Sequence, residues 1–399
     1  MRTRFLWILA ILALVAIGFL MACSTKYSAS SNGLVVVPSQ GYAAMETFSL
    51  DLSNGHLSQI NNGNGPPTNG LPTSVILDPA GAFAYVIVYQ NPAVIGSVTG
   101  IQTFQVASDG KLAPIATTPM TNPVAIAMDS AGKFLFVANG NEGTVSVFSI
   151  GSNASLNGVG GATLPPQPGG QSPSASALAV TPTVFPPLYA YCSGFTPPAF
   201  TPPTTEILYV TDSVNYVLLD YSVSSTGSLT PIPSQPTGVP TGTSPAGVAV
   251  DPCNRFAYVT NGKSNNVSAY TICSVVSQSC QQADYSLQAV ANYPAGDVPG
   301  PLAVDPYGNS LYVVNTGSNN LSGYQISPTN GTLTAFSGAP VATNSGPNSI
   351  AIRSDDTWIF VANFNSGTLS QYAITPRPGV LTVEPVITTF NQPTGVAVK

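Results

Sequence analysis

Pro245-Ala246-Gly247-Val248-Ala249-Val250-Asp251, followed after a short turn by Tyr258-Val259-Thr260-Asn261, is a stretch that recurs along this chain. Further copies run from Pro123 to Asn139 and from Pro299 to Asn315. A unit of this length that recurs along a sequence is typical of solenoids, propellers and other repeat arrays. The repeat therefore decides the fold.

Each full copy is expected to form four strands, because Asn-Gly and Asp-Gly pairs before the fourth favour tight hairpins. The last copy contains one strand only, and residues 34–60 supply the three strands that it lacks. We therefore predict an all-β fold over residues 34–399, a seven-bladed β-propeller whose C-terminal strand pairs into the first blade and closes the ring. The copies start near Pro72, Pro123, Ala175, Pro245, Pro299, Pro347 and Pro393.

Two polar positions of the repeat have structural interpretations. The Asp that ends the first strand, such as Asp251, is expected to cap the following turn through its carboxylate. The Asn that ends the second strand, such as Asn261, is expected to do the same in the next loop. Neither position predicts catalysis.

Residues 1–22 have the pattern of a secretory signal peptide, because Arg2 and Arg4 precede an apolar run. Leu20-Met21-Ala22-Cys23 resembles the lipobox of bacterial lipoproteins, which implies cleavage before Cys23 and acylation of its thiol. Residues 23–33 would then be the acylated cysteine and a tether. We predict a protein of the cell envelope, lipid-anchored in the outer membrane and either periplasmic or surface-exposed. An uncleaved membrane anchor is the alternative.

Composition excludes several kinds of partner. Only 7% of the 399 residues are charged and the net charge is −6, whereas charged residues make up about 25% of ordinary soluble domains. A basic run is missing, so no nucleic-acid partner is expected. The sequence has no His pair, close Cys quartet or calcium loop. We therefore predict no metal and no cofactor. We also predict that the protein is a monomer.

Tyr258-Val259-Thr260-Asn261 spells the motif of the YVTN repeats, and the chain from residue 34 to 399 resembles the seven-bladed lactonase-like propellers. That family includes 6-phosphogluconolactonases, and the resemblance implies a lactonase that uses His, Arg and Glu side chains. The single histidine, His56, lies in a turn, and Glu142 and Glu206 are isolated carboxylates. We assign no catalytic residue.

Arg353 and Lys399 end neighbouring inner strands and are candidates for a small anion site. Turn capping and ion pairing are equally good explanations of both. From this shortage of catalytic groups we predict a membrane-anchored scaffold that binds a protein, peptide or glycan. The alternative is a lactonase-type enzyme that acts on sugar lactones.

Four cysteines remain after Cys23, and an even number in an exported protein suggests disulfides. Cys273–Cys280 is favoured as a local clip and Cys192–Cys253 as a link between blades. Cys253–Cys273 with Cys192–Cys280 is the second arrangement, and four free thiols are the third possibility.

The insertion between Pro182 and Glu206 lies on the same face as these cysteines. Its aromatic residues form a candidate partner-binding patch, and a covering flap over the blade edge is the alternative. The patch residues are Phe185, Tyr189, Tyr191, Phe195 and Phe200.

Overall fold

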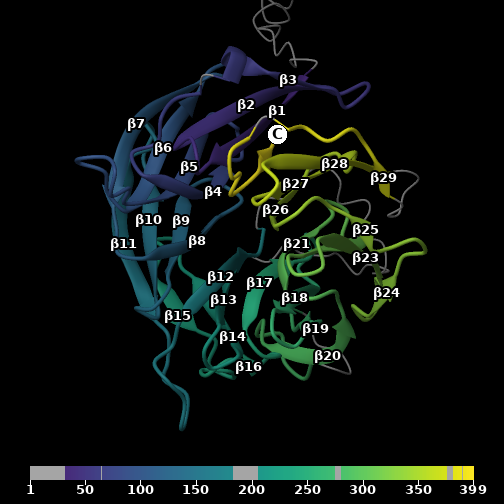
Figure 1. Cartoon of the computed structure of the whole chain (residues 1–399). Coiled ribbons are helices and arrows are strands. Elements are labelled where there is room, and N and C mark those ends of the chain that lie inside the picture. Colours follow the sequence, from purple (N-terminus) through teal and green to yellow (C-terminus); the bar gives the residue numbers. More distant parts are fainter. Residues whose placement is uncertain (1–31, 64, 183–204, 275–279, 375–380, 389) are drawn as a thin grey trace, which may run out of the picture.

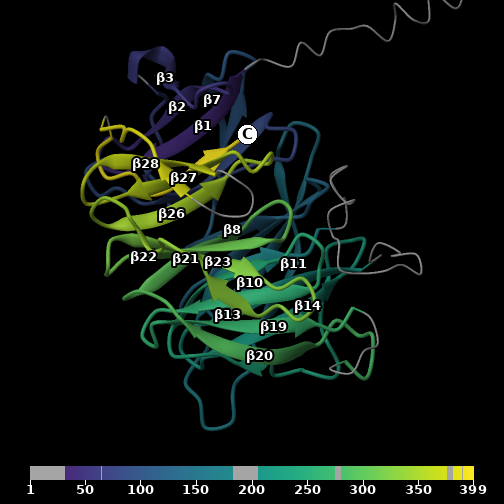
Figure 2. The same ribbon diagram turned by 90° about the vertical axis from the view of Figure 1, so that its right-hand side faces the viewer.

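The computed structural model describes residues 32–63, 65–182, 205–274, 280–374, 381–388 and 390–399. Seven antiparallel sheets surround a common centre (Figure 1). The strands nearest the centre are the first of each repeat, and those of successive blades contact one another. Figure 2 shows the sheets from the side. The predicted seven-bladed propeller is therefore confirmed.

The blades are numbered along the chain, and their strands are given from the centre outward. Blade 1 contains β30 (Ala397–Val398), β1 (Asn32–Ser39), β2 (Ala44–Asp51) and β3 (Leu57–Gln59), and the short 3-10 helix η1 (Ile60–Gly63) follows β3. Blade 2 contains β4 (Leu71–Leu77), β5 (Phe83–Tyr89), β6 (Gly100–Val106) and β7 (Leu112–Pro119). Blade 3 contains β8 (Pro123–Met128), β9 (Phe134–Asn139), β10 (Thr144–Ile150) and β11 (Leu156–Thr163).

In blades 4 and 6 the outermost strand is split into two short segments. Blade 4 contains β12 (Ala175–Val180), β13 (Glu206–Asp212), β14 (Val217–Val223), β15 (Leu229–Pro231) and β16 (Val239–Pro240). Blade 5 contains β17 (Pro245–Val250), β18 (Phe256–Asn261), β19 (Asn266–Ile272) and β20 (Leu287–Pro294). Blade 6 contains β21 (Pro299–Val304), β22 (Ser310–Asn315), β23 (Asn320–Ile326), β24 (Leu333–Ala335) and β25 (Val341–Ala342). Blade 7 contains β26 (Pro347–Ile352), β27 (Trp358–Asn363), β28 (Thr368–Ile374) and β29 (Leu381–Val383).

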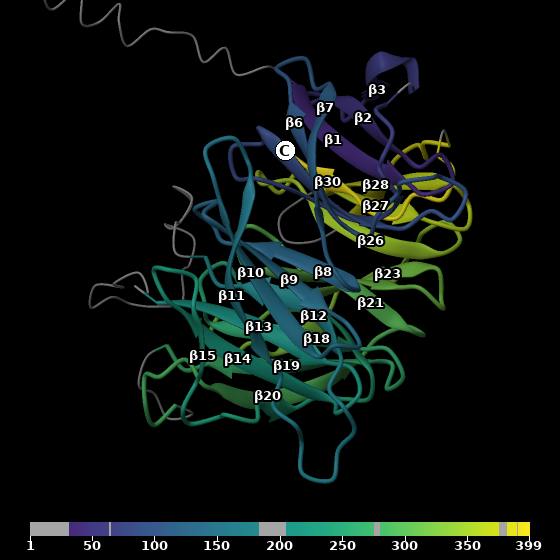
Figure 3. The same ribbon diagram turned by 90° about the vertical axis from the view of Figure 1, so that its left-hand side faces the viewer.

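The C-terminal strand closes the ring as predicted. Val398 of β30 pairs with Val35 of β1 in antiparallel register, and Figure 3 shows the two strands side by side. The backbones of Leu34 and Lys399 bond in both directions, with N–O distances of 3.1 and 2.9 Å. The first blade is thus built from both ends of the propeller.

The apolar core is divided among the junctions between blades. At the junction of blades 5 and 6, Phe256 and Tyr258 pack with Leu311 and Val313. Equivalent clusters fill the other junctions, because each sheet has both faces covered by its neighbours. In the part of the chain that the structure describes, no helix is long and apolar enough to span a membrane.

Residues of the repeat motif join one blade to the next through hydrogen bonds. The Tyr258 hydroxyl donates to the Gly331 carbonyl at 3.1 Å, and Thr260 Oγ1 donates to the Gly300 carbonyl at 2.6 Å. Both acceptors belong to blade 6. Asn261 Nδ2 donates to Ser268 Oγ at 2.9 Å within its own blade. A buried polar group that has a partner is tolerated at little cost.

The Asn position begins a relay toward the preceding blade. In blade 5, Tyr270 is hydrogen-bonded to Ser268 and donates its hydroxyl to the Pro240 carbonyl of blade 4 at 2.7 Å. Blades 6 and 7 repeat the relay with Asn315, Ser322 and Tyr324, and with Asn363, Ser370 and Tyr372. The Asn therefore reaches beyond the loop that it was expected to cap.

Candidate functional site at the a–b mouth

The ring has two ends, and charged side chains gather at one of them. We call this end the a–b mouth, because it carries the turns between the first and second and between the third and fourth strands of each blade. The opposite end is the b–c mouth. The charged residues of the a–b mouth include Asp78, Asp109, Lys111, Asp129, Lys133, Glu206, Asp251, Arg255, Asp284, Asp305, Arg353, Asp355 and Lys399.

The predicted turn capping by the Asp of the repeat is confirmed. Asp129 Oδ1 accepts the backbone N–H groups of Lys133 and Phe134, both at 2.6 Å. Asp305 does the same for Tyr307 and Asn309. These carboxylates hold the a–b turns in shape.

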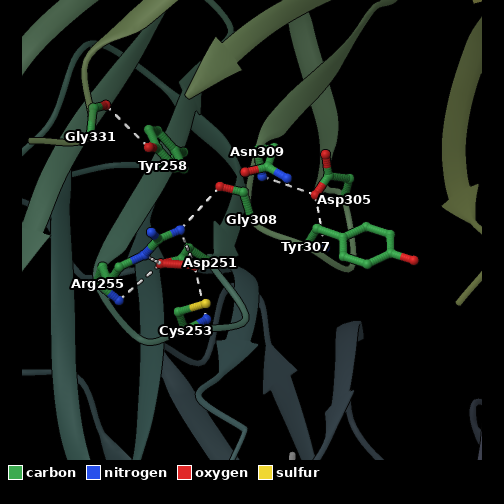
Figure 4. A network of polar contacts seen from close by, with 9 residues as sticks. All are labelled: Asp251, Cys253, Arg255, Tyr258, Asp305, Tyr307, Gly308, Asn309 and Gly331. Atoms are coloured by element: carbon green, nitrogen blue, oxygen red, sulfur yellow. Dashed lines mark hydrogen bonds and ion pairs between the residues drawn. The ribbon is translucent and has the colours of Figure 1, made fainter. Parts of the chain in front are cut away.

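In blade 5 a buried charge of the mouth is neutralised by an ion pair. Arg255 Nε bonds Asp251 Oδ2 at 2.8 Å, and Arg255 Nη2 reaches the Gly308 carbonyl of blade 6 at 3.1 Å (Figure 4). The two side chains are 5% and 0% exposed. This network satisfies a buried ion pair and ties two turns together, so it is structural.

Glu206 occupies the repeat position of Arg255 but has a different environment. It is the first residue of β13 and is 8% exposed. Leu208 and Val210 pack against blade 3, and alternate residues of a strand share a face. Glu206 therefore faces Asp129 and Lys133 of blade 3. Its Oε1 is buried and has no hydrogen-bond partner among the described residues.

Burial raises the pKa of Glu206 to about 8, and the negative charge of Asp129 adds to the rise, whereas the charge of Lys133 opposes it. Burial also raises the pKa of Asp129. Lys133 itself is exposed and donates its ammonium to the Ser225 carbonyl at 2.5 Å. A carboxyl that changes its protonation near neutral pH is suited to proton transfer. Glu206, Asp129 and Lys133 are called the mouth cluster below.

The other predicted residues remain apart from the mouth cluster. Arg353 forms an ion pair with Asp355 in its own turn, and burial lowers its pKa. The Lys399 ammonium bonds the Ala80 carbonyl of blade 2. The two candidates for an anion site thus engage separate partners. His56 is exposed in its turn, where its ring bonds the Ser58 hydroxyl at 3.3 Å.

Glu142 is exposed in a loop of the b–c mouth. Burial and the charge of Glu142 raise the pKa of Tyr89, in that order. The Tyr89 hydroxyl donates to the Pro123 carbonyl at 2.6 Å. Glu142 and Glu206, both isolated in the sequence, therefore lie at opposite ends of the ring.

The structure joins Cys273 and Cys280 in a disulfide. Cys253 is also disulfide-bonded, and Cys192 lies outside the described residues. Cys23 and the five aromatic residues of the predicted patch lie outside them as well. The insertion that carries the patch leaves blade 4 next to blade 5, where Asn254 Nδ2 donates to the Pro182 carbonyl at 3.0 Å. Across the described ranges, no group of three or more His, Cys, Asp or Glu side chains is arranged to hold a metal ion.

The sequence profile of the family described as "Lactonase, 7-bladed beta-propeller" matches residues 33–180 and 198–399. The chain belongs to this lactonase family. No curated protein matches its sequence. The family match overturns the interpretation of the chain as a non-catalytic binding scaffold. That interpretation relied on spacing along the sequence, which separates Asp129 from Glu206, whereas adjacent blades bring them together.

Solved structures similar to this lactonase-family chain share its fold. A candidate 6-phosphogluconolactonase from Bacteroides fragilis is 17% identical, with a TM-score of 0.72 over 94% of this chain and 99% of that one. A Lactobacillus plantarum protein gives 17% and 0.71 over 92% and 99%. The periplasmic gluconolactonase of Pseudomonas aeruginosa gives 18% and 0.66 over 92% and 98%. At these identities the likeness shows the fold alone.

Proposed function

We propose that the protein is a lactone hydrolase. The observation that carries the proposal is the match of the lactonase family over nearly the whole ring. Of two similar structures, the one from Bacteroides fragilis is described as a candidate 6-phosphogluconolactonase and the one from Pseudomonas aeruginosa as a periplasmic gluconolactonase. The reaction adds water to the ring ester and gives the open hydroxy acid.

We further propose that the substrate is an uncharged lactone. Recognition of a phosphate group requires cationic donors. The described cations of the a–b mouth already have protein acceptors: Lys133 bonds Ser225, Arg255 bonds Asp251, and Lys399 bonds Ala80. Arg353 and Lys111 are paired with Asp355 and Asp109 in the same way. Arg377 lies outside the described residues.

The test compares D-glucono-1,5-lactone with its 6-phosphate, with the spontaneous rate subtracted. We expect hydrolysis of both to exceed the spontaneous rate, and at least a tenfold higher kcat/KM for the neutral lactone, because a paired cation contributes little to phosphate binding. A preference for the phosphate would contradict the proposed substrate class. Absence of hydrolysis above the spontaneous rate would contradict the enzymatic function itself.

We also propose that the enzyme is exported and anchored by a lipid on Cys23. The support is the lipobox-like Leu20-Met21-Ala22-Cys23 after an apolar run. A single acyl chain holds a protein only weakly at a membrane, so stable anchoring requires more than one. The multiple acylation that the resemblance to lipoproteins implies would meet that requirement.

A further inference from the structure

We infer that Glu206 is the general base of the proposed lactone hydrolysis, at a site on the a–b mouth between blades 3 and 4. This inference rests on the proposed function and adds the group that moves the proton. It requires that the carboxyl has no structural task, that it lies where a substrate can arrive, and that its surroundings control its protonation.

The first requirement is met by comparison within the repeat. The residue that immediately precedes or begins the second strand is Lys133 in blade 3, Glu206 in blade 4 and Arg255 in blade 5. Lys133 and Arg255 both bond acceptors in a following blade. Glu206 Oε1 has no such partner within the described structure. A buried carboxyl oxygen without a partner destabilises a fold, so this position does not serve stability.

The second requirement is met by the position of Glu206 in the ring. The residue begins β13 at the a–b mouth, so it lies at the end of its sheet, although its side chain is buried and only 8% exposed. The cross-strand partner of Glu206 is Val223, at the last position of β14. Among the residues of β13 that face blade 3, Glu206 is therefore the one nearest this mouth, and Leu208 and Val210 of the apolar core lie deeper in the junction.

The third requirement is met by the two charges of blade 3 that act on the carboxyl. Asp129 favours the protonated form and Lys133 favours the carboxylate. Both come from the a–b turn of blade 3, and the described residues of β14 that face the same junction are uncharged. In the mouth cluster, one negative and one positive side chain thus shift the pKa of Glu206 in opposite directions.

The chemical step uses only water and the lactone. The Glu206 carboxylate takes a proton from water as the water oxygen bonds the carbonyl carbon. The bond between that carbon and the ring oxygen then breaks, and the ring oxygen receives the proton from Glu206. The products are one hydroxy acid and the original carboxylate, so atoms and charge balance. The active form is therefore the ionised one.

The pH dependence follows from the direction of the shift. With a pKa of about 8, roughly one tenth of Glu206 is ionised at pH 7, and this fraction falls tenfold for each lower pH unit. The pH profile of kcat/KM reports the ionisation of the free enzyme. We expect log kcat/KM for D-glucono-1,5-lactone to rise with a slope of about 1 between pH 5 and pH 7.5.

The decisive experiment measures this profile for the full chain and for four variants. Glu206→Gln should lower kcat/KM at pH 7.5 by about 100-fold or more and remove the slope. Asp129→Asn keeps an oxygen for the turn but loses the negative charge, so activity at pH 6 should rise. Lys133→Met should lower the activity at pH 6. Glu142→Gln, at the opposite mouth, should behave as the wild type.

The outcomes distinguish the enzymatic function from the role of Glu206 in it. A wild-type chain that hydrolyses no lactone overturns the proposed function and this inference with it. An active wild type with an equally active Glu206→Gln variant and an unchanged slope overturns the role of Glu206 alone. Opposite changes for Asp129→Asn and Lys133→Met support the inference independently of the Glu206→Gln variant. Unchanged profiles in both variants contradict it.

Discussion

Replacing Asp220 with Asn should stabilise the protein, and the gain should depend on pH. Asp220 lies in β14 and is 2% exposed, and neither of its carboxyl oxygens has a partner among the described residues. The equivalent residue of blade 7, Gln371, donates to the Gly55 carbonyl of the next blade at 2.8 Å. Asp220 faces blade 5 without such a bond, beside its cross-strand neighbour Tyr209. A carboxyl in this position is costly to ionise.

The size of the effect follows from the shift in pKa. Burial raises the pKa of Asp220 from 3.8 to about 7, and the charge of Asp284 adds to the rise. The folded protein therefore holds a proton that the unfolded chain releases above pH 4. The contribution of Asp220 to the free energy of unfolding is therefore fully present below the unfolded pKa, and it is lost as the pH rises toward 7. The difference of about 3 pKa units corresponds to at most about 4 kcal/mol.

Urea unfolding of the wild type and of Asp220→Asn at pH 4.5, 6 and 7.5 measures this effect. The amide cannot ionise, so the free energy of unfolding of the variant should exceed that of the wild type by little at pH 4.5. The excess should grow to between about 2 and 4 kcal/mol at pH 7.5. Contributions from other titrating groups cancel in the difference. A difference that is equal at all three pH values refutes the reasoning.

Asp212→Asn is the matched control, because Asp212 is also buried in blade 4 but has many partners. Its Oδ1 accepts backbone N–H groups from Ser174, Val214 and Asn215 at 3.0 to 3.1 Å. Its Oδ2 accepts from Asn215 Nδ2 at 2.8 Å. Loss of these charge-assisted bonds should destabilise the protein at pH 7.5. The two substitutions, chemically identical, should therefore act in opposite directions.

Three further predictions concern the ring and its anchor. Deleting residues 396–399 removes β30 and the burial of Val396, and should lower the free energy of unfolding by about 3–6 kcal/mol in urea titrations; unchanged unfolding would mean that closure contributes nothing. Arg255→Met leaves Asp251 buried without its cation and should cost about 3–5 kcal/mol, with partial recovery in the double variant with Asp251→Asn; a silent single variant would contradict the structural role of the pair. Cys23→Ser should move the protein from the membrane to the soluble fraction of the producing cell, and retention in the membrane would rule out a lipid on Cys23.

The fold could be predicted because the repeat places the same residue types at the same depth in every blade. A missing first strand at one end and a lone strand at the other imply closure, which the pairing of Val35 with Val398 confirms. The partners of the motif residues could not be predicted. Thr260 bonds Gly300 and Tyr270 bonds Pro240, and which blade edge receives each hydroxyl depends on three-dimensional twist.

The mouth cluster was missed for a related reason. Glu206 has no charged neighbour in the sequence, and the single histidine, His56, lies in a turn of blade 1 far from it along the chain. A signal was nevertheless present in the repeat. When the starts of the second strands are aligned, Glu206 is a carboxylate where Lys133 and Arg255 are cations. Equivalent positions of consecutive blades are neighbours in a closed ring, so this alignment already brings opposite charges together.

Blade 4 combines these departures from the repeat. Glu206, Tyr209, Asp220 and Tyr221 each have a buried oxygen that lacks a partner in the described part of the chain. Blade 5 satisfies the corresponding tyrosines, because Tyr258 bonds Gly331 and Tyr270 bonds Pro240. In blade 4 the serine of the relay is replaced by Leu219, which cannot bond the Tyr221 hydroxyl.

Such unsatisfied groups are rare in folded proteins and destabilise them. Blade 4, which also carries the longest insertion, is the described blade in which two of these groups are buried carboxyls with raised pKa values, Glu206 and Asp220. If Glu206 is the base, removing the orphaned carboxyl should raise stability while it lowers activity. Asp220→Asn, on the other face of the same blade, should raise stability and leave hydrolysis intact. Measured together, the two variants show whether the unpartnered carboxyl of Glu206 serves catalysis or is only a departure of blade 4 from the repeat.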